Sequence, residues 1–256
     1  MLLDPDHLLR ALLVFVRVGG LFVAAPFFGQ RLIPVQVKVM LAAVLAFSLA
    51  GLVGGALPPG VTHPVGFVVA LAVEALTGAL LGFAAQFVFY AVQFAGDVIG
   101  FQMSLSLAQI YNPISGEPSN PLGRVLTLGF MLLFILLGGP QQLVLALVSS
   151  FQVVPLAGAD LAAGGPLLLQ WTGAFFTTAL RLAAPFMVTL FLIDVALGVF
   201  ARVVPQADLF SLGLPLKILA GLSLFALFVQ QFGPVAPDLV ARMVEDVAQL
   251  LGVLGG

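Results

Sequence analysis

The chain has 256 residues, of which 61% are hydrophobic and only 8% are charged, and its mean hydropathy is +1.20. Soluble domains carry about 25% charged residues, so this composition excludes an ordinary soluble fold. The net charge of −2 does not indicate nucleic acid as a partner. The absence of cysteine excludes disulfides, thiolate chemistry and sulfur-bound metals.

The first two apolar segments are 8–28 and 35–57, and proline and glycine residues end each of them. The chain opens with Asp4 and Asp6 where a signal peptide needs basic residues, and Arg17 interrupts the apolar run. We therefore expect the first helix to be retained. Both segments are long enough to cross a bilayer.

The segment 65–103 stays apolar for longer than one bilayer crossing requires, and it predicts either a long bent helix or a helical hairpin. The next segment, 104–123, is the most polar of the chain, and its Asn-Pro pairs at Asn112 and Asn120 favour turns. We expect it to be a non-helical loop. The following segment, 124–155, should form two shorter helices on either side of Gly138-Gly139-Pro140.

Two further apolar segments, 170–200 and 211–232, precede a tail that begins after Pro234 and Pro237. The polar residues of the tail share one helix face, which predicts a separate amphipathic C-terminal helix. The chain is therefore expected to be an all-α integral membrane protein. It should have five to six long, partly broken helices and the C-terminal amphipathic helix.

Enzyme chemistry is not indicated by the side chains available. The two histidines, His7 and His63, lie near segment ends, and the sequence contains neither an HExxH nor a GxxxxGK[ST] motif. We predict no catalytic residue, no cofactor and no metal site.

Charged residues inside the apolar segments are the informative exceptions, because a charge at membrane depth costs roughly 3 kcal/mol or more unless it is paired or hydrated. These residues are Arg17, Glu74, Asp97, Arg181 and Asp194. One interpretation is a proton or ion relay. The favoured one is that they form ion pairs buried between helices or subunits, or lie outside the lipid.

Three glycine pairs have the G-x-x-x-G spacing that lets helix backbones approach closely. The pairs are Gly51 with Gly55, Gly78 with Gly82, and Gly96 with Gly100. Together they predict dense packing between helices.

Four ordered stretches between residues 8 and 232 resemble the FliR family of flagellar type III export-gate proteins, whose counterpart in virulence secretion is the SctT family. The stretches are Arg17-Val-Gly-Gly-Leu-Phe-Val-Ala-Ala-Pro-Phe-Phe-Gly with Pro34 and Lys38, Gly96-Asp-Val-Ile-Gly-Phe-Gln-Met, Asp194-Val-Ala-Leu-Gly with Arg202-Val-Val-Pro-Gln, and Leu214-Pro-Leu-Lys-Ile.

This resemblance implies a non-enzymatic subunit of an export gate in the bacterial inner membrane, at the flagellar basal body. It implies FliP-like, FliQ-like and FlhB-like subunits as partners, and unfolded flagellar proteins as substrates. It further implies a FliP-like part over 1–165 and a FliQ-like hairpin with an amphipathic tail over 166–256. On this basis, we expect buried or intersubunit charges at Arg17, Glu74, Asp97, Arg181, Asp194, Arg202 and Lys217.

The polar loop resembles the family's plug, a segment that closes the channel until substrate arrives. The plug residues implied here are Met103, Leu105, Tyr111, Asn112, Pro113, Ile114, Glu117 and Asn120. Two positions depart from the family pattern. The family commonly has Gln-Met-Gly and a later Asp-Pro, where this chain has Gln102-Met103-Ser104 and Asn112-Pro113.

Two other functions stay open at this point. A secondary transporter could use Asp97, Asp194 and the broken helices as a coupling site, but transporters usually show two related halves and this sequence shows no such repeat. The same kind of gate could also serve a virulence secretion system.

Overall fold

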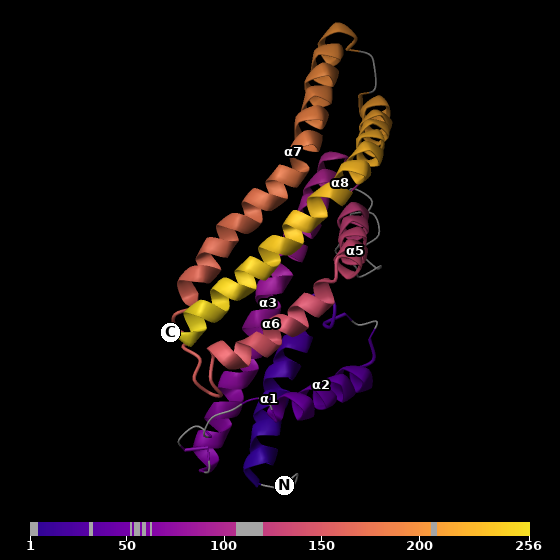
Figure 1. The fold of residues 1–256 in the computed structure, drawn as a ribbon. Helices are drawn as coiled ribbons and strands as arrows, with labels where there is room; N and C mark the ends of the chain where they lie inside the picture. The colour runs from indigo at the N-terminus through magenta and orange to yellow at the C-terminus, as the bar shows by residue number, and fades with distance from the viewer. Residues whose placement is uncertain are drawn as a thin grey trace. The chain divides into compact units, whose positions relative to one another are not determined.

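The computed structural model describes residues 5–30, 33–51, 53, 57, 60–61, 63–105, 120–205 and 209–256. Over these residues the chain forms helices and no strands, which confirms the all-α prediction (Figure 1). The helices are α1 (Pro5–Ala24), α2 (Val35–Ala50), α3 (Pro64–Gln102), α5 (Pro121–Leu136), α6 (Gly139–Val153), α7 (Gly165–Val203) and α8 (Leu209–Gly255).

Four of these helices, α1, α3, α7 and α8, are long and apolar enough to cross a membrane. The count rises to five if the broken pair α5 and α6 forms one span. The chain is thus a multi-pass membrane protein, as its composition predicted.

The first two helices are shorter than predicted. Helix α1 ends at Ala24, because Pro26 disfavours a helical backbone at the residue before it. Helix α2 ends at Ala50, and its 16 residues span only about 24 Å, less than the hydrocarbon core of a bilayer. The prediction that the second segment runs to Leu57 as a full span is therefore wrong. Gly51 and the glycines after it favour the end of the helix.

Helix α3 is continuous over 39 residues, which excludes the hairpin alternative for the segment 65–103. The predicted break between α5 and α6 is confirmed. Gly138 lies at that break with φ +75°, a left-handed conformation that glycine adopts without steric cost.

The predicted separate C-terminal helix is wrong, because α8 continues from Leu209 to Gly255 through Pro215, Pro234 and Pro237. Each proline removes one backbone hydrogen bond and tends to kink a helix. Ending the helix in apolar surroundings would leave several backbone groups unsatisfied at once. This would cost more free energy than the single hydrogen bond that each proline removes.

The chain divides into two compact units, and α3, α7 and α8 contribute residues to both. Unit 1 comprises residues 1–87, 137–172 and 240–256, and unit 2 comprises 88–136 and 173–239. The predicted FliP-like and FliQ-like parts, divided at residue 165, stay a prediction.

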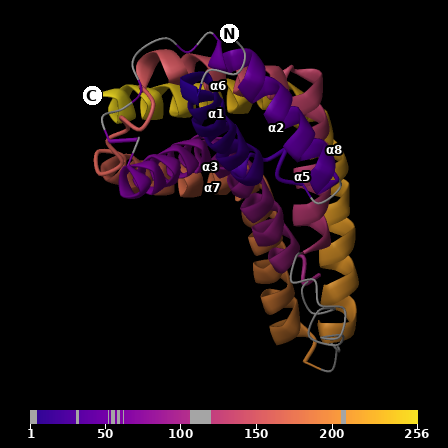
Figure 2. The ribbon, with the colours of Figure 1, turned by 90° about the horizontal axis from the view of Figure 1, so that it is seen from below.

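In unit 1, α1 lies beside the N-terminal part of α3 (Figure 2). The core of this unit includes Leu13, Val14, Leu21, Leu81 and Leu250, each at most 1% exposed.

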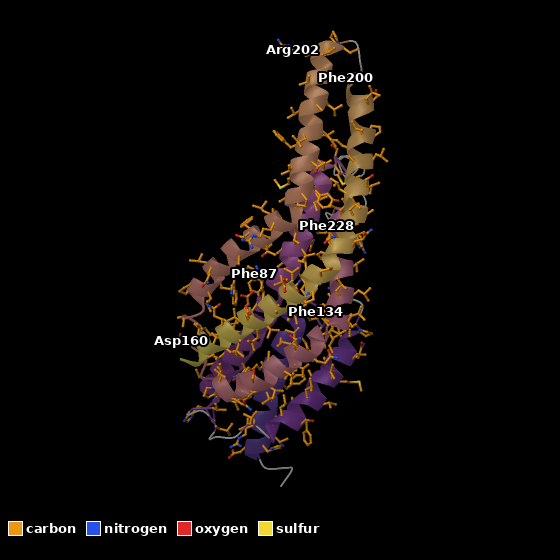
Figure 3. The ribbon with its side chains drawn as sticks, turned by 45° about the horizontal axis from the view of Figure 1, so that its top comes forward. Phe87, Phe134, Asp160, Phe200, Arg202 and Phe228 are labelled. Carbon is orange, nitrogen blue, oxygen red and sulfur yellow. The ribbon has the colours of Figure 1, made fainter. Side chains whose placement is uncertain are left out.

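Aromatic rings form much of the core of unit 2. The ring centroid of Phe89 lies 4.7 Å from that of Phe130 and 5.2 Å from that of Phe134, which joins α3 to α5. The ring of Phe186 lies 5.3 Å from that of Phe228, which joins α7 to α8. Figure 3 labels Phe134 and Phe228 among the side chains.

Candidate functional site

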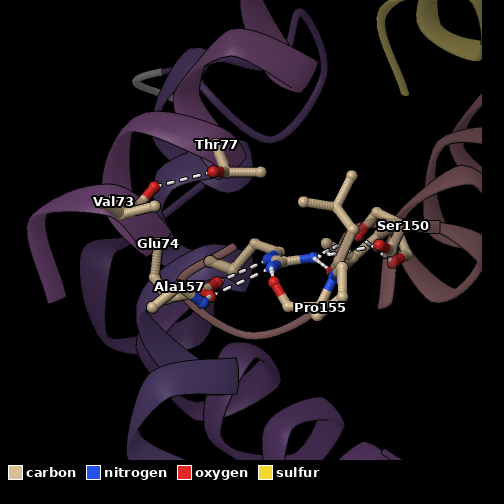
Figure 4. Close-up of polar contacts among 9 residues, drawn as sticks. Val73, Glu74, Thr77, Ser150, Pro155 and Ala157 are labelled. Carbon is tan, nitrogen blue, oxygen red and sulfur yellow. Dashed lines mark hydrogen bonds and ion pairs between the residues drawn. The ribbon is translucent and has the colours of Figure 1, made fainter. Parts of the chain in front are cut away.

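Unit 1 contains a buried polar cluster, which we name the Arg17 cluster (Figure 4). It joins α1, α3, the end of α6 and the loop after α6. Its members are Arg17, Glu74, Ser150, Val154, Pro155 and Ala157.

The centre of this cluster is an ion pair with two parallel hydrogen bonds. Arg17 Nε donates to Glu74 Oε2 at 2.5 Å, and Arg17 Nη2 donates to Glu74 Oε1 at 3.0 Å. Both side chains are fully buried. Paired N–H···O bonds between guanidinium and carboxylate are among the strongest polar contacts in proteins. The two charges therefore neutralise each other inside the chain.

The opposite edge of the Arg17 guanidinium caps the C-terminal end of α6. Arg17 Nη1 donates to the carbonyl oxygens of Ser150 and Val154, at 3.1 and 3.0 Å, and Nη2 donates to that of Pro155 at 3.3 Å. The last carbonyls of a helix lack intrahelical partners and carry partial negative charge. All five N–H donors of an arginine are satisfied in this arrangement.

Glu74 also holds the loop that follows α6. Its Oε1 accepts a hydrogen bond from the backbone N–H of Ala157 at 2.6 Å. Ala157 has φ +54°, a left-handed backbone conformation that alanine rarely adopts. The hydrogen bond to a buried carboxylate stabilises this conformation, so the cluster ties three separate parts of unit 1 together.

The α1 and α3 backbones come into contact beside the Arg17 cluster, because glycines line the crossing. A Cβ atom added to Gly78 would lie 2.0 Å from the Arg17 carbonyl oxygen, and one added to Gly82 would lie 2.7 Å from that of Leu21. On the α1 side, a Cβ atom at Gly20 would lie 2.5 Å from the Ala75 carbonyl oxygen. The G-x-x-x-G pair on α3 therefore fits the close approach that its spacing predicts.

Unit 2 contains the two ends of the predicted plug loop. At the first end, α3 finishes with two backbone hydrogen bonds, Ser104 N to the Phe101 carbonyl at 2.9 Å and Leu105 N to the Gly100 carbonyl at 3.0 Å. This is the Schellman pattern, which needs a left-handed residue after the helix. Ser104 takes that conformation, with φ +63°. It stands where the family commonly has glycine.

Replacing Ser104 with glycine is expected to stabilise the folded chain by about 1 kcal/mol, because glycine adopts the left-handed conformation without a clash. Thermal unfolding in mild detergent measures the effect. The control is Ser223→Gly at an exposed position inside α8, where the same exchange should destabilise by about 0.5 kcal/mol. If both variants changed the free energy of unfolding in the same direction, the left-handed conformation of Ser104 would not explain the effect.

At the second end of the loop, Asn120 caps α5. Its Oδ1 accepts a hydrogen bond from the Leu122 N–H at 3.1 Å, with Pro121 at the first helical position. The Asn120 side chain is 4% exposed and lies on α3, since a Cβ atom at Gly100 would fall 1.9 Å from Asn120 Nδ2. The Asp97 carboxylate accepts a hydrogen bond from the Asn120 backbone N–H.

A second close backbone approach lies next to this cap. A Cβ atom at Gly96 would lie 2.5 Å from the Gly123 Cα, and one at Gly123 would lie 2.3 Å from Asp97 Oδ1. The end of α3 and the start of α5 are therefore fixed against each other. The two ends of the loop that connects α3 to α5 therefore lie close together.

The remaining predicted plug residues differ in what the structure describes of them. Met103 is fully buried and packs on Gly221 of α8, and Leu105 is partly buried. Tyr111, Asn112, Pro113, Ile114 and Glu117 lie outside the described residues. The assignment of these residues to a plug stays a prediction.

The other predicted charges lie on α7 and α8. Asp194 and Lys217 contact each other as an ion pair within unit 2. Arg181 and Arg202 are exposed on α7.

Residue patterns gave no indication of the backbone partners of Arg17, because Ser150 and Val154 lie more than 130 positions away in the chain. The involvement of Gly123 was also missed. The cap at Asn120 had a signal in the sequence, since asparagine before proline is typical of a helix start. Within the described residues no group of three or more His, Cys, Asp or Glu side chains could hold a metal ion.

These features define a class: a multi-pass helical membrane protein whose embedded charges include ion pairs within the chain, with close helix contacts through glycine. Comparison with known proteins gives the family. Residues 8–243 match the model of "Bacterial export proteins, family 1", so the chain belongs to this family of export proteins, and the FliR prediction is confirmed.

Two relatives illustrate how much of the chain is shared. The chain is 33% identical to the flagellar biosynthetic protein FliR of Escherichia coli K12 over 241 residues, which are 93% of this chain and 91% of that protein. It is 31% identical to the protein of the same name from Bacillus subtilis 168, over 95% of each chain. The family match over residues 8–243 spans the positions of the Arg17 cluster and both ends of the loop.

Proposed function

We propose that this chain is a core subunit of the flagellar type III protein export gate, which helps to form and close the channel for unfolded flagellar proteins. The observation that carries the proposal is the similarity to flagellar FliR proteins over nearly the whole length of both chains. The multi-pass helical fold supports the same function at the bacterial inner membrane. Membership of an export family indicates a component of an export apparatus, and we propose that the chain has no catalytic activity.

FliP-like, FliQ-like and FlhB-like subunits are the partners that we propose. Several helices expose large apolar side chains along much of their length. These surfaces support the proposal that the chain is assembled with other subunits. On α2 these side chains are Val35, Val37, Met40, Val44 and Phe47, each at least 50% exposed. Such a surface needs either lipid or other apolar helices around it.

The loop between α3 and α5 is the part that we propose closes the channel. A closing segment needs fixed ends and a middle that can take two arrangements, of which substrate binds the open one better. The hydrogen bonds of Ser104, Leu105 and Asn120 supply the fixed ends. Irregular backbone at membrane depth is tolerated where protein or a water-filled cavity surrounds it, and a channel meets that condition.

A replacement of residues 108–117 by an equally long glycine and serine segment tests this closure. Ser104 and Asn120 are retained, so both helix ends keep their hydrogen bonds. With the whole gate present, the membrane is expected to become permeable to small ions and solutes, measured as dye or ion flux. The control replaces residues 54–59, between α2 and α3, by an equally long glycine and serine segment. This variant should leave the membrane impermeable to small ions and solutes. Unchanged permeability in the 108–117 variant would contradict closure by this loop.

A further inference from the structure

The start of α5 lacks one half of a common helix cap. In a capping box, the capping side chain bonds forward into the helix, and a Glu or Gln three positions later accepts a hydrogen bond from the backbone N–H of the capping residue. Asn120 makes the forward bond, because its Oδ1 accepts from the Leu122 N–H at 3.1 Å. Gly123 stands at the position of the Glu or Gln, so α5 offers no side-chain acceptor there.

Close packing against α3 explains why Gly123 has no side chain. A Cβ atom at Gly96 would lie 2.5 Å from the Gly123 Cα, so the two backbones touch at this crossing. A Cβ atom at Gly123 would overlap Asp97 Oδ1 and lie 3.1 Å from the Gln93 carbonyl oxygen, both on α3. The Asp97 carboxylate therefore fills the space that a side chain of α5 would need.

Asp97 also supplies the missing acceptor. Its carboxylate accepts a hydrogen bond from the Asn120 backbone N–H, which is the bond that the Glu or Gln of a capping box would accept. The partial positive charge of the first N–H groups of a helix favours a carboxylate at this place. Asp97 thus takes over, from α3, both the space and the hydrogen bond of the third residue of α5.

Both ends of the loop between α3 and α5 meet the same turn of α3. At the outgoing end, the Gly100 carbonyl accepts the hydrogen bond from the Leu105 N–H. At the returning end, a Cβ atom at Gly100 would overlap the Asn120 side chain. Asp97 lies three positions before Gly100, on the same helix face. Residues 96–100 therefore contact the chain where it leaves α3 and where it enters α5.

We propose that Asp97 is a positioning residue for the closing loop: it completes the cap of α5 from α3 and so holds the returning end of the loop in place. This inference rests on the proposed function, because it gives Asp97 a part in the closure of the channel. It also gives an embedded carboxylate a function other than charge pairing or an ion relay. Asn120 is only 4% exposed, so water cannot readily replace the Asp97 acceptor.

Moving the acceptor from α3 to α5 tests the proposal. Asp97→Ala removes the carboxylate, and Gly123→Glu in the same chain supplies one at the capping-box position. Asp97→Ala also removes the atoms that a side chain at position 123 would overlap, which leaves the Gln93 carbonyl oxygen as the nearest neighbour, at 3.1 Å. Gly123→Met in the Asp97→Ala chain is the matched control, because methionine fills the space without a carboxylate. Asp238→Ala, at an exposed position of α8, controls for the loss of a carboxylate elsewhere.

Two measurements are made on the chain assembled with the subunits that accompany it. Hydrogen exchange followed by mass spectrometry reports on the amides of residues 120–126, and ion or dye flux reports on closure of the membrane. Asp97→Ala is expected to speed this exchange about fivefold, the size of effect typical for loss of a helix cap, and to raise the flux. Asp238→Ala should change neither value.

The variants at position 123 should have opposite effects in the two backgrounds. In the Asp97→Ala chain, Gly123→Glu should return exchange and flux toward the wild-type values, whereas Gly123→Met should not. In the wild-type chain, Gly123→Glu alone should speed exchange, because its side chain would overlap Asp97. Wild-type exchange in Asp97→Ala, failure of Gly123→Glu to rescue it, or equal rescue by Gly123→Met would each overturn the proposal.

The replacement of residues 108–117 separates a failure of this proposal from a failure of the proposed function. If that replacement makes the membrane leak but Asp97→Ala does not, closure by the loop stands and the part given to Asp97 is wrong. If neither variant leaks, closure by the loop is wrong, and the exchange data decide whether Asp97 caps α5. Asp97→Asn keeps the size of the side chain with a weaker, uncharged acceptor, and it serves if Asp97→Ala fails to assemble. It should speed exchange by a smaller factor, and wild-type exchange in that variant would overturn the proposal.

Discussion

Replacing Glu74 with glutamine is expected to lower the free energy of unfolding by about 3–5 kcal/mol. The exchange keeps the size of the side chain but leaves the Arg17 guanidinium charged and without its counterion in a site with no exposure to solvent. It also weakens the hydrogen bond that holds Ala157 in its left-handed conformation. Thermal unfolding of the purified chain in mild detergent measures the loss, and reduced yield of assembled complex should accompany it.

Two further variants separate the charge effect from a general effect of the exchange. Glu245→Gln places the same exchange at an exposed position of α8 and should change stability by less than about 0.5 kcal/mol. The double variant Arg17→Met with Glu74→Leu removes both charges, but it also leaves the Ala157 N–H and the carbonyls of Val154 and Pro155 without these partners. It should therefore be no more stable than Glu74→Gln, because each unsatisfied buried polar group costs about 1–3 kcal/mol. A Glu74→Gln variant as stable as Glu245→Gln would show that the pair contributes little.

Replacing Gly78 with alanine is expected to destabilise the chain by more than about 3 kcal/mol. The new methyl group would lie 2.0 Å from the Arg17 carbonyl oxygen, and this backbone atom cannot move without shifting α1. Overpacking in a tightly packed core usually costs 1–3 kcal/mol, and here the atom in the way belongs to the backbone. The shift would also stretch the ion pair between Arg17 and Glu74, so the two effects add.

Adjacent glycines in α1 provide the control for this prediction. A Cβ atom at Gly19 would meet nothing within 4 Å, whereas one at Gly20 would meet the Ala75 carbonyl oxygen at 2.5 Å. Gly19→Ala should be neutral or stabilise by up to about 1 kcal/mol, because alanine favours helix. Gly20→Ala should destabilise. Equal stability of these two variants would contradict the described crossing of α1 and α3.

Much of the fold could be predicted from the sequence because apolar length and helix-breaking residues are local signals. The break at Gly138 followed from the Gly-Gly-Pro sequence, whereas the long apolar run before it left open whether α3 is one helix or a hairpin. The prolines of α8 misled the prediction, since Pro234 and Pro237 would end a helix in water. In apolar surroundings the backbone keeps its remaining hydrogen bonds instead.

The candidate sites were less accessible to prediction because they depend on contacts between distant segments. The charges of Arg17 and Glu74 were identifiable as costly in an apolar segment, but nothing local indicated that the two would pair across 57 positions. The carbonyls of Val154 and Pro155 carry no sequence signal, since every residue has one. Ser104 was visible only as a departure from the family pattern, and its φ of +63° explains why glycine suits that position.

The copy number of the chain in its native assembly tests the account most directly. Native mass spectrometry of the complex purified in mild detergent would resolve a subunit of 26.6 kDa. We expect one copy of this chain together with several copies of FliP-like and FliQ-like subunits. A stable assembly of this chain with itself, without those partners, would contradict its function as an export-gate subunit.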